Sequence, residues 1–216
     1  MAPGHPTSAP RDALSPVGLL LACVMTAGAL LLVNGVHGGE PPRPSAAQAF
    51  SAPAHPTGRT VRPLPPADPV RLRIAAIGVD APMTRVGLDA TGALRTPAGG
   101  EPGLVGWYGD GTAPGSAGTA VATGHVDTPT GDPGVFYDLG ALARGATIEV
   151  RRADRRTALF AVRAVELYDR DEFPSEKVYG SSGRPELRLI TCGGGYTKRT
   201  GYLGNVVVYA TLTAVT

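Results

Sequence analysis

Residues 187–194 read LRLITCGG, a run in which branched apolar side chains alternate up to Cys192 and two glycines follow at once. This pattern is typical of a strand that ends in a turn. The other cysteine of the chain, Cys23, lies in an apolar N-terminal segment, and His125 is the one histidine beyond residue 55. A single thiol and a single imidazole, each at the end of a strand-like run, suggest a cysteine nucleophile with a histidine partner.

The composition fits one β-rich domain. The chain has 216 residues, of which 43% are hydrophobic and 18% charged, and its 30 glycines and 21 prolines suit many turns between short strands. The net charge of +2 is too small to indicate a nucleic-acid partner. The arginine pairs at residues 151–152 and 155–156 are interpreted as a solvated strand and turn.

The N-terminal part predicts a membrane anchor. Residues 17–36 carry no charge, and their length matches the roughly 20 residues that span a bilayer. Residues 34–38 make a poor signal-peptidase site, so an uncleaved anchor is favoured over a cleaved signal peptide. Arg11 lies before the anchor, which favours a short cytoplasmic segment over residues 1–16 and an extracellular domain. Cys23 is interpreted as a membrane-buried residue, so the exported thiol has no disulfide partner.

Residues 37–68 are rich in Pro, Ala, Gly and Ser, and we expect a partly extended stalk there. The folded domain is expected over residues 69–216. Short strands are predicted over residues 70–74, 118–123, 147–151, 159–165, 187–191 and 206–212. Helix signals are few, and the best lie over residues 138–143 and 174–179. Seven or eight short strands separated by Gly and Pro turns predict an all-β closed barrel or sandwich.

The residues around Cys192 and His125 offer the parts that thiol chemistry needs. A free thiol with a pKa of about 8.5 is mostly protonated at neutral pH, and a nearby imidazolium favours the thiolate. Gly124 permits a sharp turn before His125, and Asp127 is placed to orient the ring. Each of the two residues has a structural interpretation, as a buried small residue or a turn residue. Their joint occurrence favours the catalytic one.

Metal chemistry is not expected. One cysteine and one histidine do not make a closed zinc site. Asp169, Asp171 and Glu172 lie beside Arg170, and we interpret this stretch as a solvated turn rather than a calcium loop.

Several blocks of the sequence resemble the sortases, the membrane-anchored cysteine transpeptidases of Gram-positive bacteria. Residues 189–192, LITC, resemble the signature of the strand that carries the sortase cysteine. The resemblance covers residues 69–216 and is greatest to the class F sortases of actinobacteria. The six blocks that carry it occur in the same order: residues 77–82 (IGVDAP), 106–108 (GWY), 124–127 (GHVD), 135–137 (VFY), 191–194 (TCGG) and 205–210 (NVVVYA).

This resemblance implies a closed eight-stranded β-barrel with one or two short helices, preceded by a single transmembrane helix. It implies Cys192 as nucleophile and His125 as general acid for the leaving amine. Thr191, Gly193 and Asn205 would contact the substrate. The enzyme would cleave a sorting signal of the Leu-Pro-x-Thr-Gly type after Thr and form a thioacyl intermediate. Its partners would be secreted proteins with a C-terminal sorting signal, a peptidoglycan precursor amine and the membrane, with no cofactor and no nucleic acid.

The basic residue of the site departs from the family pattern. Many sortases carry an arginine 13 residues after the cysteine, and this position is Asn205 here. The preceding loop, residues 197–202 (TKRTGY), is one residue shorter than in class F and lacks its histidine. Arg199 is predicted to bind the oxyanion and the substrate, with Lys198 as the second candidate, because a planar guanidinium donates two parallel hydrogen bonds.

Three alternatives compete with the sortase interpretation. An L,D-transpeptidase is disfavoured because its motif places Ser-x-Gly before the cysteine, whereas Thr191 precedes Cys192 here. A papain-like protease has Cys before His in the chain, the reverse of this order. The third alternative is a catalytically impaired, membrane-anchored β-barrel that binds cell-envelope components, and the unusual loop over residues 197–202 favours it.

Overall fold

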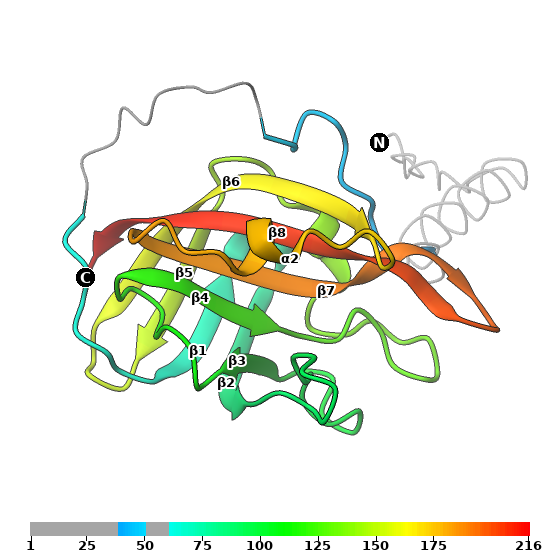
Figure 1. The fold of residues 1–216 in the computed structure, drawn as a ribbon, viewed down its shortest axis with the longest axis horizontal. Coiled ribbons are helices and arrows are strands. Elements are labelled where there is room, and N and C mark those ends of the chain that lie inside the picture. Colours follow the sequence, from blue (N-terminus) through cyan, green and yellow to red (C-terminus); the bar gives the residue numbers. More distant parts are fainter. Residues whose placement is uncertain (1–38, 51–60) are drawn as a thin grey trace, which may run out of the picture. The chain divides into compact units, whose positions relative to one another are not determined.

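Buried and exposed side chains alternate along some strands of the fold, such as β5 (Thr147–Arg152). In this strand, Ile148 and Val150 are fully buried while Thr147 and Arg151 are exposed. The computed structural model describes residues 39–50 and 61–216. Its strands close into a barrel in the order β1-β2-β3-β4-β7-β8-β6-β5 (Figure 1). The structure thereby confirms the predicted all-β class and the closed eight-stranded barrel.

The elements follow the predicted ones closely in their central parts. The two predicted helical stretches correspond to the 3-10 helix η2 (Tyr137–Ala141) and the α-helix α2 (Ser175–Tyr179), and a further 3-10 helix, η1, covers Ala75–Ile77. The remaining strands are β1 (Pro69–Ile74), β2 (Val79–Val86), β3 (Val105–Tyr108), β4 (Gly118–Thr123), β6 (Thr157–Asp169), β7 (Pro185–Thr197) and β8 (Gly201–Val215).

Apolar side chains pack on both faces of the barrel wall. The main core fills the interior, with Phe160, Leu187 and Leu189 fully buried. A second cluster lies on the other face of β4, β7 and β8, where Val178 of α2 packs with Ile190 and four further residues. The connection between β6 and β7 therefore covers the outer face of these strands, which explains why β4 is buried along its whole length.

The barrel order places the ends of β4 and β7 together. These strands are parallel neighbours, and their register runs from Gly118 opposite Pro185 to Thr123 opposite Ile190. Because the carboxyl ends of parallel strands meet at one edge, the residues that follow β4 lie beside the residues that follow Ile190. On its other side β7 pairs antiparallel with β8.

The segment expected to form a stalk contacts the barrel. The Gln48 side-chain amide donates to the carbonyls of Gly140 and Leu142 at 2.8 Å and 2.9 Å. The Phe50 ring packs edge-on against Tyr209, with 4.8 Å between ring centroids. Glu40–Thr216 accordingly form one unit. This docking differs from a freely extended stalk, because the backbone takes part as well: Val165 donates to the carbonyl of Gln48 at 2.9 Å, and the Phe50 N–H donates to Glu166 at 3.0 Å.

The membrane anchor predicted for residues 17–36 lies outside the described residues. Within residues 39–50 and 61–216, no helix has the length and apolar character needed to cross a bilayer. The anchor and the limits of the stalk therefore stay predictions.

Candidate active site

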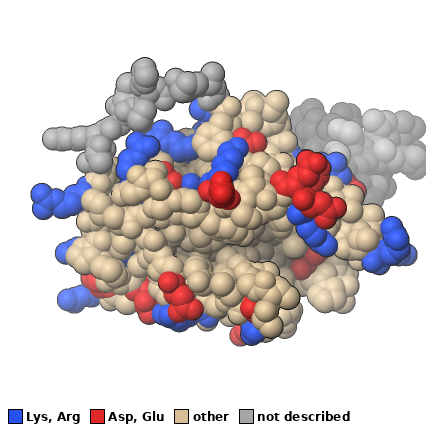
Figure 2. All heavy atoms as spheres, viewed as in Figure 1, with Lys and Arg blue, Asp and Glu red and all other residues tan. Residues whose placement is uncertain are grey.

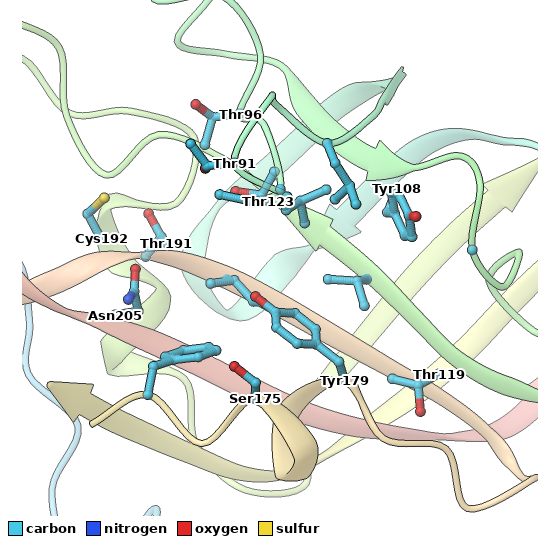
Figure 3. Close-up of a pocket in the computed structure, with 18 of the residues that line it drawn as sticks. Thr91, Thr96, Tyr108, Thr119, Thr123, Ser175, Tyr179, Thr191, Cys192 and Asn205 are labelled. Carbon is cyan, nitrogen blue, oxygen red and sulfur yellow. The ribbon is translucent and has the colours of Figure 1, made fainter. Parts of the chain in front are cut away.

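A groove with a volume of about 820 Å³ runs along the outer face of β4 and β7. Its walls are the connection between β2 and β3 on one side and the connection between β6 and β7 on the other. Figure 3 shows Cys192 and Asn205 together at one end of the groove, with Tyr179 and Thr119 towards the other. The face in Figure 2 is hollowed in its middle, and the hollow is mainly uncharged. Among the described residues that line the groove, Arg170 alone carries a formal charge.

Cys192 is a free, solvent-exposed cysteine on β7. It lies directly opposite Asn205 of β8, and both residues line the groove. Although its side chain is exposed, enough protein surrounds it that desolvation raises the pKa of its thiol above the usual value. The nearby charge of Arg170 opposes this effect and that of Asp127 adds to it. Burial thus disfavours the thiolate, and its activation depends on neighbouring groups.

The end of β4 brings the segment that carries His125 against the strand that carries this cysteine. Gly124 donates its N–H to the carbonyl of Ile190 at 3.3 Å, and the Thr191 hydroxyl donates to the carbonyl of Gly124 at 2.8 Å. These two bonds hold the segment that carries His125 against the stretch of β7 that carries Cys192. Nε2 of His125 lies 2.8 Å from the carbonyl oxygen of Pro97. When Nε2 carries a proton it donates to that carbonyl, which leaves Nδ1 available.

Asp127 has a different partner from the one expected. The hydroxyl of Tyr202 donates to Oδ2 of Asp127 at 2.5 Å. Burial and this bond raise the pKa of Tyr202 well above its usual value, so the hydroxyl remains a donor. The sequence suggested that Asp127 orients the His125 ring, but the carbonyl of Pro97 makes the ring contact and Asp127 ties the β4 loop to β8.

The other predicted substrate-binding residues surround the thiol. Thr191 is buried and lines the groove together with Asn205. Gly193 is buried and does not line it. A Cβ at Gly193 would meet the Val206 side chain at 2.8 Å, so this glycine lets β7 and β8 pack closely.

Arg199 does not line the groove. It lies in the exposed turn at residues 198–200 that joins β7 to β8. Thr197, the last residue of β7, lies five positions beyond Cys192, a distance of roughly 16 Å along an extended strand. Figure 1 shows the two strands projecting together beyond the barrel.

Arg170 is the charged group that sequence analysis missed. It follows the last residue of β6, and its backbone N–H donates to the carbonyl of Leu203 at 2.9 Å. Its neighbours Asp169, Asp171 and Glu172 suggested a solvated turn. The signal that could have identified it is barrel closure, which brings the end of β6 beside β8.

Among the described residues, no three His, Cys, Asp or Glu side chains form a group that could hold a metal ion. The arrangement offers a thiol and a guanidinium at one end of the groove, and an imidazole on the segment that the Thr191–Gly124 bond holds against β7. Such a set can carry out nucleophilic acyl transfer on an extended peptide.

Comparison with known proteins identifies the domain and its fold. A family model described as the sortase domain matches residues 72–213. The SrtA sortase from Actinomyces oris is similar in structure, with a TM-score of 0.52 and 17% identity, over 74% of this chain and 89% of that one. The lid mutant of sortase A from Corynebacterium diphtheriae has a TM-score of 0.51 and 17% identity, over 68% and 70%.

Sortase C1 of Streptococcus agalactiae, solved as a complex with MTSET, has a TM-score of 0.50 and 19% identity, over 68% and 69% of the two chains. At such identities these three structures show a shared fold. No curated protein sequence matches the chain.

Proposed function

Because the chain belongs to the sortase family, we propose that it is a cysteine transpeptidase that joins secreted proteins to a cell-wall amine. The observation that carries this proposal is the exposed Cys192 thiol at the end of the groove, where the bond between Thr191 and Gly124 brings the His125 segment beside it. His125 follows β4 and Cys192 lies on β7, and the barrel pairs these two strands in parallel, which holds the two segments together as acyl transfer requires.

In the proposed reaction the Cys192 sulfur attacks the carbonyl carbon of the Thr–Gly bond of a Leu-Pro-x-Thr-Gly-like signal. A C–S bond forms and the carbonyl electron pair moves to oxygen. When the intermediate collapses the C–N bond breaks, and His125 gives the leaving amine the proton that it took from the thiol. The acceptor amine then attacks the thioester, loses a proton to His125 and releases the sulfur. A peptidoglycan precursor would supply this amine.

The groove supports an uncharged peptide substrate. Threonines such as Thr119 and Thr123, together with apolar side chains such as Val121 and Ile190, line it from one end to the other. A Leu-Pro-x-Thr segment carries no obligatory charge, and its backbone can use the hydroxyls as hydrogen-bond partners.

The class F assignment and the location rest on the sequence. The six class F-like blocks favour an actinobacterial sortase, and the uncharged residues 17–36 favour a single-pass anchor in the membrane of a Gram-positive cell. The catalytic domain would then face the outside, where both the sorting signal and the wall precursor occur.

Mass spectrometry of the full chain in detergent tests the activity. The protein is incubated with a library of Leu-Pro-x-Thr-Gly peptides, with and without an added primary amine, and Cys192→Ala is the control. We expect an acyl adduct on Cys192 that the amine releases as an amide. Processing of the peptide by Cys192→Ala would disprove the thioacyl route.

A binding domain with an impaired site is the second candidate, because desolvation raises the pKa of Cys192 and Arg199 lies outside the groove. Alkylation of the wild-type thiol separates the two functions. An activated thiol reacts quickly at neutral pH, whereas a structural one is slow. A slow reaction together with no peptide adduct would favour the binding domain.

A further inference from the structure

We propose that Arg170, and not Arg199, is the cationic group of this active site, where it stabilises both the Cys192 thiolate and the oxyanion of the tetrahedral intermediate. This inference rests on the proposed transpeptidase function and names a residue for it. Negative charge that develops on the sulfur and on the carbonyl oxygen needs a donor held in place before the reaction starts. Arg170 is the one charged residue among the described residues that line the groove with Cys192.

The strand register places Arg170 on the same face of the sheet as the thiol. Cys192 of β7 lies opposite Asn205 of β8, and Asn205 lies opposite Tyr168 of β6. Arg170 is two residues beyond Tyr168, and its backbone bond to Leu203 continues the β6–β8 pairing. Since side chains two residues apart share a face, Arg170 points to the side of Cys192, with about 10 Å of sheet between their strands. An extended arginine side chain covers most of such a distance.

The guanidinium is held by the backbone of the β7–β8 hairpin. Nη2 of Arg170 donates to the carbonyl of Tyr202, and Nη1 lies 3.5 Å from that of Thr200. Both acceptors are neutral carbonyls, so they orient the group without cancelling its charge. A guanidinium has five N–H donors, which leaves donors for a substrate oxygen.

The residue opposite Cys192 on β8 is uncharged, so the cation of the site must come from another element, here the residue that follows β6. This residue is Asn205, and its amide can donate a hydrogen bond but carries no charge. The charge of Arg170 also lowers the pKa of the Cys192 thiol, against the raising effect of desolvation. One side chain thus acts on both atoms that become negative.

The test compares Arg170→Ala, Arg170→Lys and Arg199→Ala with a control, Arg163→Ala. Arg163 is an exposed arginine on β6, the strand that ends just before Arg170, and it donates to the Thr211 hydroxyl. The readouts are the rate of acyl-enzyme formation and the pH profile of Cys192 alkylation. Thermal unfolding of each variant confirms that it is folded.

We expect Arg170→Ala to slow acylation by about 10²- to 10³-fold and to move the alkylation profile to higher pH. Arg170→Lys should restore the profile but only part of the rate, because lysine keeps the charge and lacks the planar fork. Arg163→Ala should behave like the wild type. Adding Asn205→Arg to Arg170→Ala should restore part of the acylation rate.

The inference is overturned if Arg199→Ala slows acylation while Arg170→Ala does not, or if Arg170→Ala leaves the alkylation profile in place. Failure of the proposed function looks different. In that case the wild type forms no acyl adduct with any peptide, while the alkylation profiles of Arg170→Ala and Arg163→Ala still show whether Arg170 acts on the thiol.

Discussion

At the scale of single residues, the reactivity of this site depends on charges that act against each other on one sulfur. The carboxylate of Asp127 raises the pKa of the Cys192 thiol, whereas the guanidinium of Arg170 lowers it, and desolvation exceeds both. Asp127 is nevertheless held close to the site by the hydroxyl of Tyr202. The carboxylate therefore stabilises the loop that follows β4 and makes the thiol less acidic.

Asp127→Asn separates these two effects, because the asparagine oxygen still accepts from Tyr202 but carries no charge. Removing the negative charge lowers the pKa of Cys192, so more thiolate is present at neutral pH. We expect alkylation to become roughly two- to fivefold faster below the thiol pKa, since one pKa unit corresponds to tenfold. The rate measured against pH checks this, with the exposed Asp138→Asn as control. A slower reaction would contradict it.

Gly124 is a second residue whose replacement has a defined result. A Cβ at this position would meet the side chains of Val135 and Phe136 at 2.6 Å and 2.8 Å. Gly124→Ala must therefore displace the end of β4, and overpacking of this kind costs about 1–3 kcal/mol. We expect a lower unfolding midpoint in denaturant and slower acylation. Gly87→Ala, where nothing lies within 4 Å, is the matched control, and equal loss in both variants would refute the argument.

At the scale of elements, α2 forms one wall of the groove although it spans only Ser175–Tyr179. So short a helix is not stable on its own, and its buried anchor is Val178, which packs in the cluster on the outer face of β4, β7 and β8. Ser175 and Tyr179 of the same helix line the groove. The position of this wall therefore depends on one side chain that faces away from the substrate.

Val178→Ala removes two methyl groups from that anchor and should destabilise the protein by about 1.6 kcal/mol. Because the groove wall loosens while Cys192 and His125 stay in place, we expect KM for the peptide to rise several-fold with little change in kcat. Steady-state kinetics measure this split. A matching fall in kcat with KM unchanged would show that α2 contributes to the chemical step instead.

The sequence predicted the centres of six of the eight strands, but neither β2 nor β3 and not all the strand ends. Residues 118–123 match β4, because Gly118 and Gly124 bound this short run. β7 and β8 extend well beyond residues 187–191 and 206–212, into the hairpin that joins them. There glycine and polar residues replace the apolar pattern, so local periodicity gives no signal although the backbone pairing continues.

The same limit applies to the site. Cys192 and His125 could be singled out because each is the last residue of a recognisable pattern. Arg170 could not be singled out, because acidic residues flank it in the sequence and suggest a solvated turn. What places it in the site is its contact with β8. That contact arises only when β6 pairs with β8 to close the barrel, and no local pattern contains such information.

At the scale of the whole molecule, stability and activity depend on different regions. Arg152 is fully buried at the end of β5 and donates to the carbonyls of Pro65 and Pro114, with Asp154 as its ion-pair partner at 3.2 Å. It thereby joins the segment before β1, the loop before β4 and the β5–β6 turn. Arg152 is absent from the groove lining among the described residues.

Arg152→Ala leaves the carbonyls of Pro65 and Pro114 without their donor, and a buried acceptor left without its donor costs about 1–3 kcal/mol. The carboxylate of Asp154 adds little, because it stays partly exposed to solvent. We expect a large fall in the denaturant midpoint, with the acylation rate per folded molecule unchanged below the transition. Equilibrium unfolding and active-site titration of Cys192 measure the two quantities on one sample. Arg152 lies at the end of β5 and does not line the groove, whereas Cys192 lies in the groove on β7. A fall in the acylation rate of the folded fraction would therefore show that the barrel transmits strain from β5 to the groove.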